Sequence, residues 1–197
     1  MQRKRHIALM GGSFNPVHIG HLMVADYVRQ TEHLDEVLMC VSPLNPFKTA
    51  ATDLASDADR MAMMQIACDR HTGLMPCDIE LTMPRPSYTI DTLNRLVDMY
   101  PDAEITIIIG SDNWLAFDRW RAAGEIISRF GVTVYPRPGY DVDEGSLPDN
   151  VKLVKAPAVD LSGTFLRRQL AAGLDMNIFM PDGVYNYIKT RKLYGTA

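Results

Sequence analysis

Short apolar runs recur along the chain, and their pattern predicts the strands of a parallel sheet. The runs do not alternate between apolar and polar positions, which is expected when helices cover both faces of the sheet. We predict four strands, over residues 6–10, 36–41, 104–110 and 131–136, and a weaker fifth over residues 151–156.

Between these runs, apolar residues recur at helical spacing. In residues 19–30, for example, Leu22, Val24, Ala25 and Val28 fall on one side of a helix. The pattern predicts helices over residues 19–30, 57–70, 89–100, 162–173 and 182–194, and the Pro- and Asp-rich stretches 42–59 and 136–150 are predicted to be loops.

Strands that alternate with helices predict an α/β fold, a doubly wound, Rossmann-like parallel sheet flanked by helices and joined by right-handed crossovers. No repeat or linker divides the sequence, so we expect a single domain over residues 1–197. In such sheets ligands bind at the carboxyl ends of the strands, near the point where the strand order reverses.

Composition and charge narrow the class of partner. The chain has 47% hydrophobic and 22% charged residues, as is ordinary for a globular domain, and a formal net charge of −4 from 20 basic and 24 acidic residues. This balance argues against general binding of nucleic acid through a basic face. It is compatible with an anionic small molecule held by a few local donors.

The cysteines and the apolar segments indicate the cellular compartment of the protein. Cys40, Cys68 and Cys77 are odd in number, far apart in sequence and without a CxxC pair, which favours a reduced, intracellular protein. The apolar stretch behind the basic N-terminus ends at Gly11, too early for a signal peptide, and no window approaches the ~20 apolar residues of a membrane span. We therefore expect a cytoplasmic protein that does not bind membranes.

The stretch GGSFNPVHIGHL, residues 11–22, joins the first predicted strand to the first predicted helix. Neither a GxGxxG fingerprint nor a P-loop lysine is present there. Gly11 and Gly12 permit a tight turn, and His18 and His21 share one face near the helix start with Gly20 between them. Free helix N–H groups and two imidazoles suit a polyphosphate.

Two other interpretations of these histidines stay open on the residues alone. One is a capping histidine beside a surface histidine, and the other is a zinc-binding pair. No third Cys or His lies at motif spacing, which disfavours zinc.

A second candidate is DLSGTFLRR, residues 160–168. Ser162 and Thr164 stand at the start of a predicted helix, and Arg167 follows one turn later. Hydroxyls, free N–H groups and a guanidinium suit phosphate. Taken alone, a capped helix with a surface arginine is the commoner explanation.

Together the two motifs resemble the (T/H)xGH and I-S-x-T-x-x-R signatures of the nucleotidyltransferase superfamily, whose members transfer an adenylyl or related group from a nucleoside triphosphate. Further segments resemble the bacterial nicotinate-nucleotide adenylyltransferase family and occur in the order typical of it: SPLNPFK, PSYTIDTL, IGSDNW, FDRW, RPG and MPDGVYNYIKTRKLY. The chain departs from the family pattern at three places: in SPLNPFK, at Asn15, where many members have Asp, and at Gly163, where many have Ser.

The resemblance implies the fold of that superfamily and adenylyl transfer from ATP to nicotinate mononucleotide, in NAD biosynthesis, with Mg²⁺ held largely by the phosphates and water and no metal site on the protein. It implies catalytic roles for His18, His21 and Arg167. It implies ATP contacts from Gly11, Gly12, Ser13, Phe14, His18, Gly20, His21, Gly110, Asp112, Ser162, Thr164 and Arg167, and mononucleotide contacts from Lys48, Ser87, Tyr88, Thr89, Trp120 and Arg137.

The residues assigned to the mononucleotide by resemblance are also chemically suited to its nicotinate group. The N–H groups at Ser87–Thr89 precede a helix and suit a carboxylate, and Tyr88 or Trp120 suits a pyridinium ring. Without the resemblance, Trp120 is a core residue, Asp112 a helix cap or a ribose acceptor, and Lys48 and Arg137 are surface charges.

Two alternative functions remain at this stage. One is a sister adenylyltransferase that acts on nicotinamide mononucleotide or phosphopantetheine. The other is a non-catalytic regulator that binds ATP or NAD. The sequence leaves open whether the chain forms a homo-oligomer.

Overall fold

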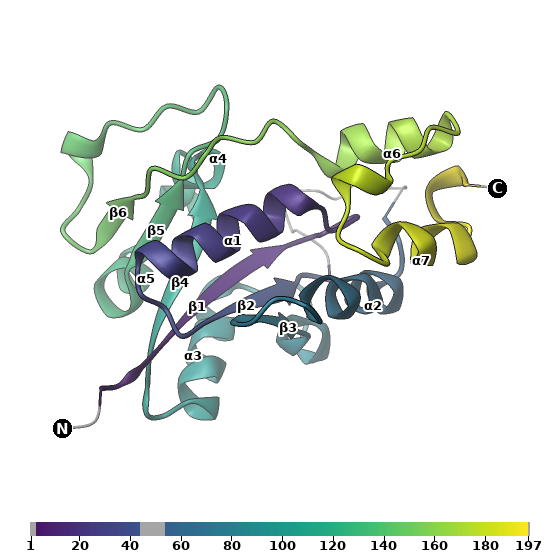
Figure 1. Ribbon diagram of the computed structural model, residues 1–197. Helices are drawn as coiled ribbons and strands as arrows, with labels where there is room; N and C mark the ends of the chain where they lie inside the picture. Colours follow the sequence, from purple (N-terminus) through teal and green to yellow (C-terminus); the bar gives the residue numbers. More distant parts are fainter. Residues whose placement is uncertain (1–2, 44–53, 197) are drawn as a thin grey trace.

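The computed structural model describes residues 3–43 and 54–196, and its centre is a six-stranded parallel sheet (Figure 1). The strand order is β3-β2-β1-β4-β5-β6. The strands are β1 (Arg5–Gly12), β2 (Glu36–Val41), β3 (Leu74–Cys77), β4 (Ala103–Gly110), β5 (Val132–Tyr135) and β6 (Val151–Leu153).

All five predicted strands are confirmed, and the sequence analysis missed β3. This strand has only four residues and contains Pro76, so it carries no continuous apolar run. It is a strand because it pairs with β2 at the edge of the sheet, where a proline is tolerated.

The helices are α1 (Ile19–Thr31), α2 (Asp57–Cys68), α3 (Thr89–Met99), α4 (Ser111–Trp114), α5 (Ala123–Phe130), α6 (Gly163–Ala171) and α7 (Val184–Thr190). The five predicted helices are confirmed, although α7 is shorter than expected and α2 includes the last residues of the predicted loop 42–59. Helices α4 and α5 were not predicted. In α5 Ile126 is the one buried residue, which is too weak a periodic signal to find.

The sheet is covered on both faces, as the prediction of a doubly wound fold requires. Helices α1 and α2 pack on one face and α3 and α5 on the other, while α6 and α7 extend the first core layer beyond the carboxyl ends of the strands, with α7 against α2 (Figure 1). Alternate residues of β1 serve the two layers, with Ala8 and Met10 facing the first and Ile7 and Leu9 the second.

The strand order reverses between β1 and β4, which are neighbours in the sheet. The carboxyl ends of these two strands, at Gly12 and Gly110, therefore form the crevice where doubly wound sheets bind ligands. Within the described part of the chain, no helix is both long and apolar enough to span a bilayer.

Candidate active site

The turn after β1 brings Phe14 beneath the second histidine. Phe14 has a positive φ of 44° and is buried, and its ring packs edge-on against His21 with centroids 4.9 Å apart. A Cβ on Gly12 would lie 3.0 Å from this ring. Gly12 therefore provides the space in which Phe14 supports His21.

His18 and His21 form one stacked pair at the start of α1. His18 is the N-cap residue, and the two rings lie 3.6 Å apart at 20°. The backbone N–H of His18 donates to Nδ1 of His21 at 3.2 Å, so the proton of a neutral His21 ring is on Nε2. The buried Nδ1 of His18 has no hydrogen-bond partner among residues 3–43 and 54–196.

Both histidines are neutral at physiological pH. Burial, followed by the positive charge of Arg137, lowers the pKa of His18 to about 4. Burial, His18 and Arg137 together lower the pKa of His21 well below its ordinary value. The pair thus offers neutral N–H donors and carries no fixed charge of its own.

The histidine pair borders a small hollow. Three of its lining residues, Tyr135, Val159 and Leu161, were not among the predicted site residues, although Leu161 belongs to the DLSGTFLRR motif. They reach the site because β5 ends beside β4 and because the segment before α6 returns over α1. The full lining is Met10, His18, Gly20, His21, Val24, Tyr135, Pro136, Arg137, Val159 and Leu161.

The start of α6 meets the turn after β1. Ser162 caps the helix by accepting from the backbone N–H of Phe165 at 3.2 Å. Nη1 of Arg167 donates to the backbone carbonyl of Asn15 at 2.8 Å, and its Nη2 donates to Oγ1 of Thr164 at 3.4 Å. The two motifs, more than 150 residues apart in sequence, are therefore in direct contact.

Gly163 is required by this contact. A Cβ at position 163 would lie 2.6 Å from the carbonyl oxygen of Asn15 and 3.3 Å from Nη1 of Arg167. The departure from the family's second serine thus has a packing reason in this chain: the helix approaches the Asn15 backbone too closely for any side chain.

The side chain of Asn15 ties the same turn to two further segments. Its Oδ1 accepts from the backbone N–H of Ala55 at 3.1 Å and from the hydroxyl of Tyr194 at 2.6 Å. Neither contact has a local sequence signal, since Tyr194 lies near the C-terminus.

A fully buried arginine, Arg60 of α2, supports the turn from below. The sequence analysis missed it, since a charged residue near a helix start carries no burial signal. Its guanidinium also pairs with Asp57. It donates to the carbonyls of Ser13 at 2.7 Å, Ser42 at 2.6 Å, Pro43 at 3.1 Å and Ala55 at 3.2 Å.

The end of β4 positions Arg137. Oγ of Ser111, a residue the sequence analysis did not single out, accepts from the backbone N–H of Arg137 at 2.9 Å. Nε of Arg137 lies 3.8 Å from Oδ1 of Asp112, and this buried oxygen has no hydrogen-bond partner within the described residues. A Cβ on Gly110 would collide with both side chains, so glycine lets Arg137 and Asp112 take these positions without shifting.

Four of the residues expected to hold the mononucleotide, Ser87, Tyr88, Thr89 and Trp120, lie around α3 and the segment after α4. Arg137 instead lines the hollow beside the histidines. Tyr88 is the N-cap residue of α3, with its ring beneath the guanidinium of Arg121 at 4.9 Å. The ring of Trp120 packs 5.0 Å from that of Phe117. Both belong to the sheet face opposite the histidines. Lys48 lies outside the described residues.

Glu80 engages the hydroxyl of Ser87. The buried Glu80 accepts from Oγ of Ser87 at 3.3 Å and from Oγ1 of Thr92 at 3.0 Å. The Ser87 hydroxyl therefore directs its proton at a carboxylate of the protein. A bound anion at this helix start would rely on the backbone N–H groups of the first turn of α3.

Comparisons with known proteins find relatives over nearly the whole chain. A family model described as cytidylyltransferase-like matches residues 9–193. A probable nicotinate-nucleotide adenylyltransferase of Bacteroides fragilis is 46% identical over 94% of this chain and 92% of its own length, and one of Bacteroides thetaiotaomicron is 42% identical over the same shares.

Among solved structures, a nicotinic acid mononucleotide adenylyltransferase of Plasmodium falciparum complexed with NaAD superposes with a TM-score of 0.81 at 20% identity. The superposition covers 98% of both chains. At this identity the likeness shows the shared fold, and it confirms the predicted nucleotidyltransferase type of sheet.

The lowered pKa of His18 predicts a pH-dependent stability. Below about pH 6.5 the unfolded chain protonates this histidine, whereas the folded protein resists protonation until about pH 4. As the pH is lowered from about 6.5 to about 4, the free energy of unfolding should therefore decrease, and His18 should account for about 3 kcal/mol of this decrease. Urea denaturation of wild type and His18→Gln at about pH 7 and about pH 4.5 measures the difference.

We expect His18→Gln to lose less stability than wild type between the two pH values. The exposed His71 provides the matched control, and His71→Gln should reproduce the wild-type fall. An equal fall in wild type and His18→Gln would contradict the assignment.

Proposed function

This chain belongs to the cytidylyltransferase-like family, within its nicotinate-nucleotide adenylyltransferase branch, and from that premise we propose that it transfers the adenylyl group of ATP to nicotinate mononucleotide. The products are nicotinate adenine dinucleotide and pyrophosphate, and the step belongs to NAD biosynthesis. The observation that carries the proposal is the contact of Arg167 with Asn15, which joins the two phosphate-binding motifs into one site. The whole chain, residues 1–197, serves as one catalytic domain.

The reaction is an in-line displacement at the α-phosphorus of ATP. A phosphate oxygen of the mononucleotide forms the new P–O bond, and the bond from the α-phosphorus to the bridging oxygen breaks as pyrophosphate leaves. The attacking oxygen is anionic near neutral pH, so no general base is required. Catalysis consists of positioning and stabilisation of charge on the phosphoryl oxygens.

The two histidines suit this role as neutral donors. Nε2–H of His21 follows from the hydrogen bond that its Nδ1 accepts from the backbone of His18. Burial makes such a donor stronger than it is in water. Ser162, Thr164 and Arg167 at the start of α6 hold the leaving pyrophosphate, with Arg167 already oriented by the Asn15 carbonyl.

A divalent ion such as Mg²⁺ would enter with ATP, held by the substrate phosphates and water, and would neutralise part of the phosphate charge. In the part of the chain that the structure describes, no group of three His, Cys, Asp or Glu side chains is arranged to hold a metal ion. The donor set of the site, with neutral histidines and arginines, fits a metal ion held by phosphates and water.

The start of α3 favours the acid over the amide. Its first-turn N–H groups and positive dipole end attract the nicotinate carboxylate, whereas a neutral carboxamide gains less. A nicotinamide mononucleotide enzyme or a phosphopantetheine enzyme is the alternative within the superfamily. A regulator that binds ATP or NAD without catalysis is the alternative outside it.

His21→Ala tests the role of the histidine pair. Loss of one preorganised donor should lower kcat by about 10²–10³. The variant also removes the acceptor of the His18 backbone N–H at the start of α1, so a thermal melt checks that the fold stays intact. Pyrophosphate release from ATP, nicotinate mononucleotide and Mg²⁺ measures the rate. The exposed His71 gives the control variant His71→Ala, and wild-type turnover in His21→Ala would remove His21 from the mechanism.

Gly163→Ala tests the contact between the two motifs. The added methyl should push α6 away from the Asn15 carbonyl and lower kcat/KM for ATP by about ten- to a hundredfold. Gly124→Ala is the matched control, because a Cβ there meets nothing within 4 Å. Equal activity of the two variants would mean that the spacing between the motifs is not critical.

A substrate panel with ATP tests the preference for the acid. We expect kcat/KM for nicotinate mononucleotide to exceed that for nicotinamide mononucleotide by about tenfold, the effect of about 1–2 kcal/mol from a partly buried helix start. Equal values for the two substrates would refute the preference.

Thr89→Pro sharpens this test by removing one backbone N–H at the first helical position. Tyr88 already has the extended φ and ψ of −117° and 142° that precede a proline, so α3 should remain intact. The preference for the acid should shrink in Thr89→Pro and persist in Thr89→Ala, which keeps the N–H group.

A further inference from the structure

Two cysteines that are far apart in sequence face each other across the edge of the sheet. Cys40 of β2 and Cys77 of β3 are paired in register in adjacent parallel strands. Residues paired in this way project to the same face of a sheet, and both cysteines pack into the core layer that contains α3 and α5. The active-site chemistry described above uses neither thiol.

The spacing of the two strands suits a disulfide. Neighbouring strands lie about 4.7–4.9 Å apart, and the Cα atoms of disulfide-bonded cysteines are usually about 4.4–6.8 Å apart. Since Cys40 and Cys77 are direct Cα partners, the two sulfurs can join without a change of register.

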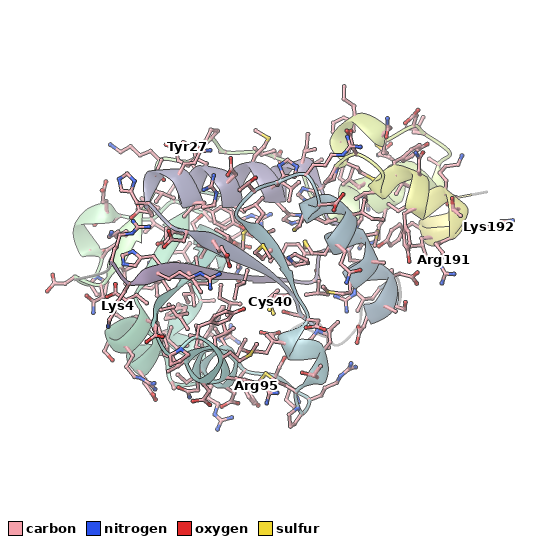
Figure 2. All side chains as sticks on the ribbon, turned by 60° about the horizontal axis from the view of Figure 1, so that its bottom comes forward. Lys4, Tyr27, Cys40, Arg95, Arg191 and Lys192 are labelled. Carbon is pink, nitrogen blue, oxygen red and sulfur yellow. The ribbon has the colours of Figure 1, made fainter. Side chains whose placement is uncertain are left out.

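The two thiols differ in access to solvent. Cys40 is fully buried, and it is labelled near the middle of the view in Figure 2. Cys77 is only partly buried. A small thiol-reactive molecule can therefore reach Cys77 first, while Cys40 stays behind it as a resolving thiol.

The local hydrogen bonds favour a thiolate at Cys77. The hydrogen bond from the Cys40 thiol, together with one from the backbone N–H of Ile79, lowers the pKa of Cys77 against the opposing effects of burial and of Asp78 and Glu80. The same thiol–thiol hydrogen bond, together with burial, raises the pKa of Cys40. Cys77 is thus the nucleophile and Cys40 the proton donor.

We propose that Cys40 and Cys77 form a redox-active dithiol site, which a low-molecular-weight disulfide converts into an intramolecular disulfide. In the first step the Cys77 thiolate attacks one sulfur of the reagent RS–SR, and an RS⁻ thiolate leaves as the mixed disulfide forms. In the second step the Cys40 sulfur attacks Sγ of Cys77, its proton passes to the departing sulfur of the reagent, and the second half leaves as RSH.

The electrons and protons balance over the two steps. The two cysteine thiols lose two electrons and two protons, and the reagent gains them to become two RSH molecules. The bond would fix β2 to β3 between two parts of the candidate active site: Ser42, whose carbonyl accepts from Arg60, and Glu80, which accepts from Ser87. The site does not depend on the proposed adenylyl transfer.

The test treats the native, fully reduced protein with glutathione disulfide, quenches with acid, and then alkylates all remaining thiols under denaturing conditions. Intact mass should show the loss of two alkylatable thiols without a retained glutathione, and a peptide map should show Cys40 linked to Cys77. Dithiothreitol should restore all three thiols.

Variants separate the two steps. Cys40→Ala should stop at one glutathione on Cys77, and Cys77→Ala should stay unmodified. Cys68 is the internal control, because it is buried in the opposite core layer and burial raises the pKa of its thiol to about 12. Cys68→Ala should form the disulfide as wild type does.

Three outcomes would overturn the proposal: all three thiols of the wild-type protein remain alkylatable, glutathione stays on Cys77 while Cys40 remains free, or Cys68 enters the disulfide. The wild-type peptide map decides between them even if Cys40→Ala, a substitution in the core, does not fold.

Discussion

The hydrogen bond from Arg167 to the backbone carbonyl of Asn15 is the contact around which the candidate site is assembled. It joins the start of α6 to the turn after β1, and it is charge-assisted, a class of hydrogen bond worth about 1.5–3 kcal/mol. The side chain of Asn15 extends the junction to Ala55 and Tyr194. Asn15 thus joins its own turn to three segments that are remote in sequence. The absence of a side chain at Gly163 allows the start of α6 to approach the Asn15 carbonyl this closely.

Two buried groups, one charged and one neutral, support the contact between Arg167 and Asn15. Arg60 keeps its charge in the interior because backbone carbonyls and Asp57 satisfy its donors, and it thereby fixes the turns after β1 and β2. The histidine pair instead becomes neutral on burial, and the nearby positive charge of Arg137 lowers the pKa of both rings further. A rigid frame therefore surrounds donors that can face a polyphosphate without carrying a charge of their own.

The two halves of the site lie on different layers of the molecule. The histidines belong to α1 on one face of the sheet, and Tyr88 and Trp120 pack on the other. They meet at the carboxyl edge, where β1 and β4 diverge and Gly110 lets Arg137 approach Asp112. In the proposed reaction, the two nucleotides would bind on opposite sides of the switch point, where doubly wound sheets hold their ligands.

The sequence by itself determined the features that depend on local spacing. The apolar runs gave five strands, the helical periodicity gave five helices, and the separation of His18 and His21 placed both rings on one face of α1. The alternation of strands and helices was sufficient for the doubly wound fold. Resemblance then supplied the roles of Ser162, Thr164 and Arg167, which spacing alone could not distinguish from a capped surface helix.

The tertiary structure decided which distant residues meet. Strand β3 exists only through its pairing with β2, and Ser111, Arg60 and Tyr194 gain their roles from partners on other elements. Cys40 and Cys77, which looked unrelated in the sequence, became neighbours through the register of two strands. The physical reason is that hydrogen bonding and burial depend on three-dimensional proximity, whereas periodicity along a chain reports only which side of its own helix or strand a residue occupies.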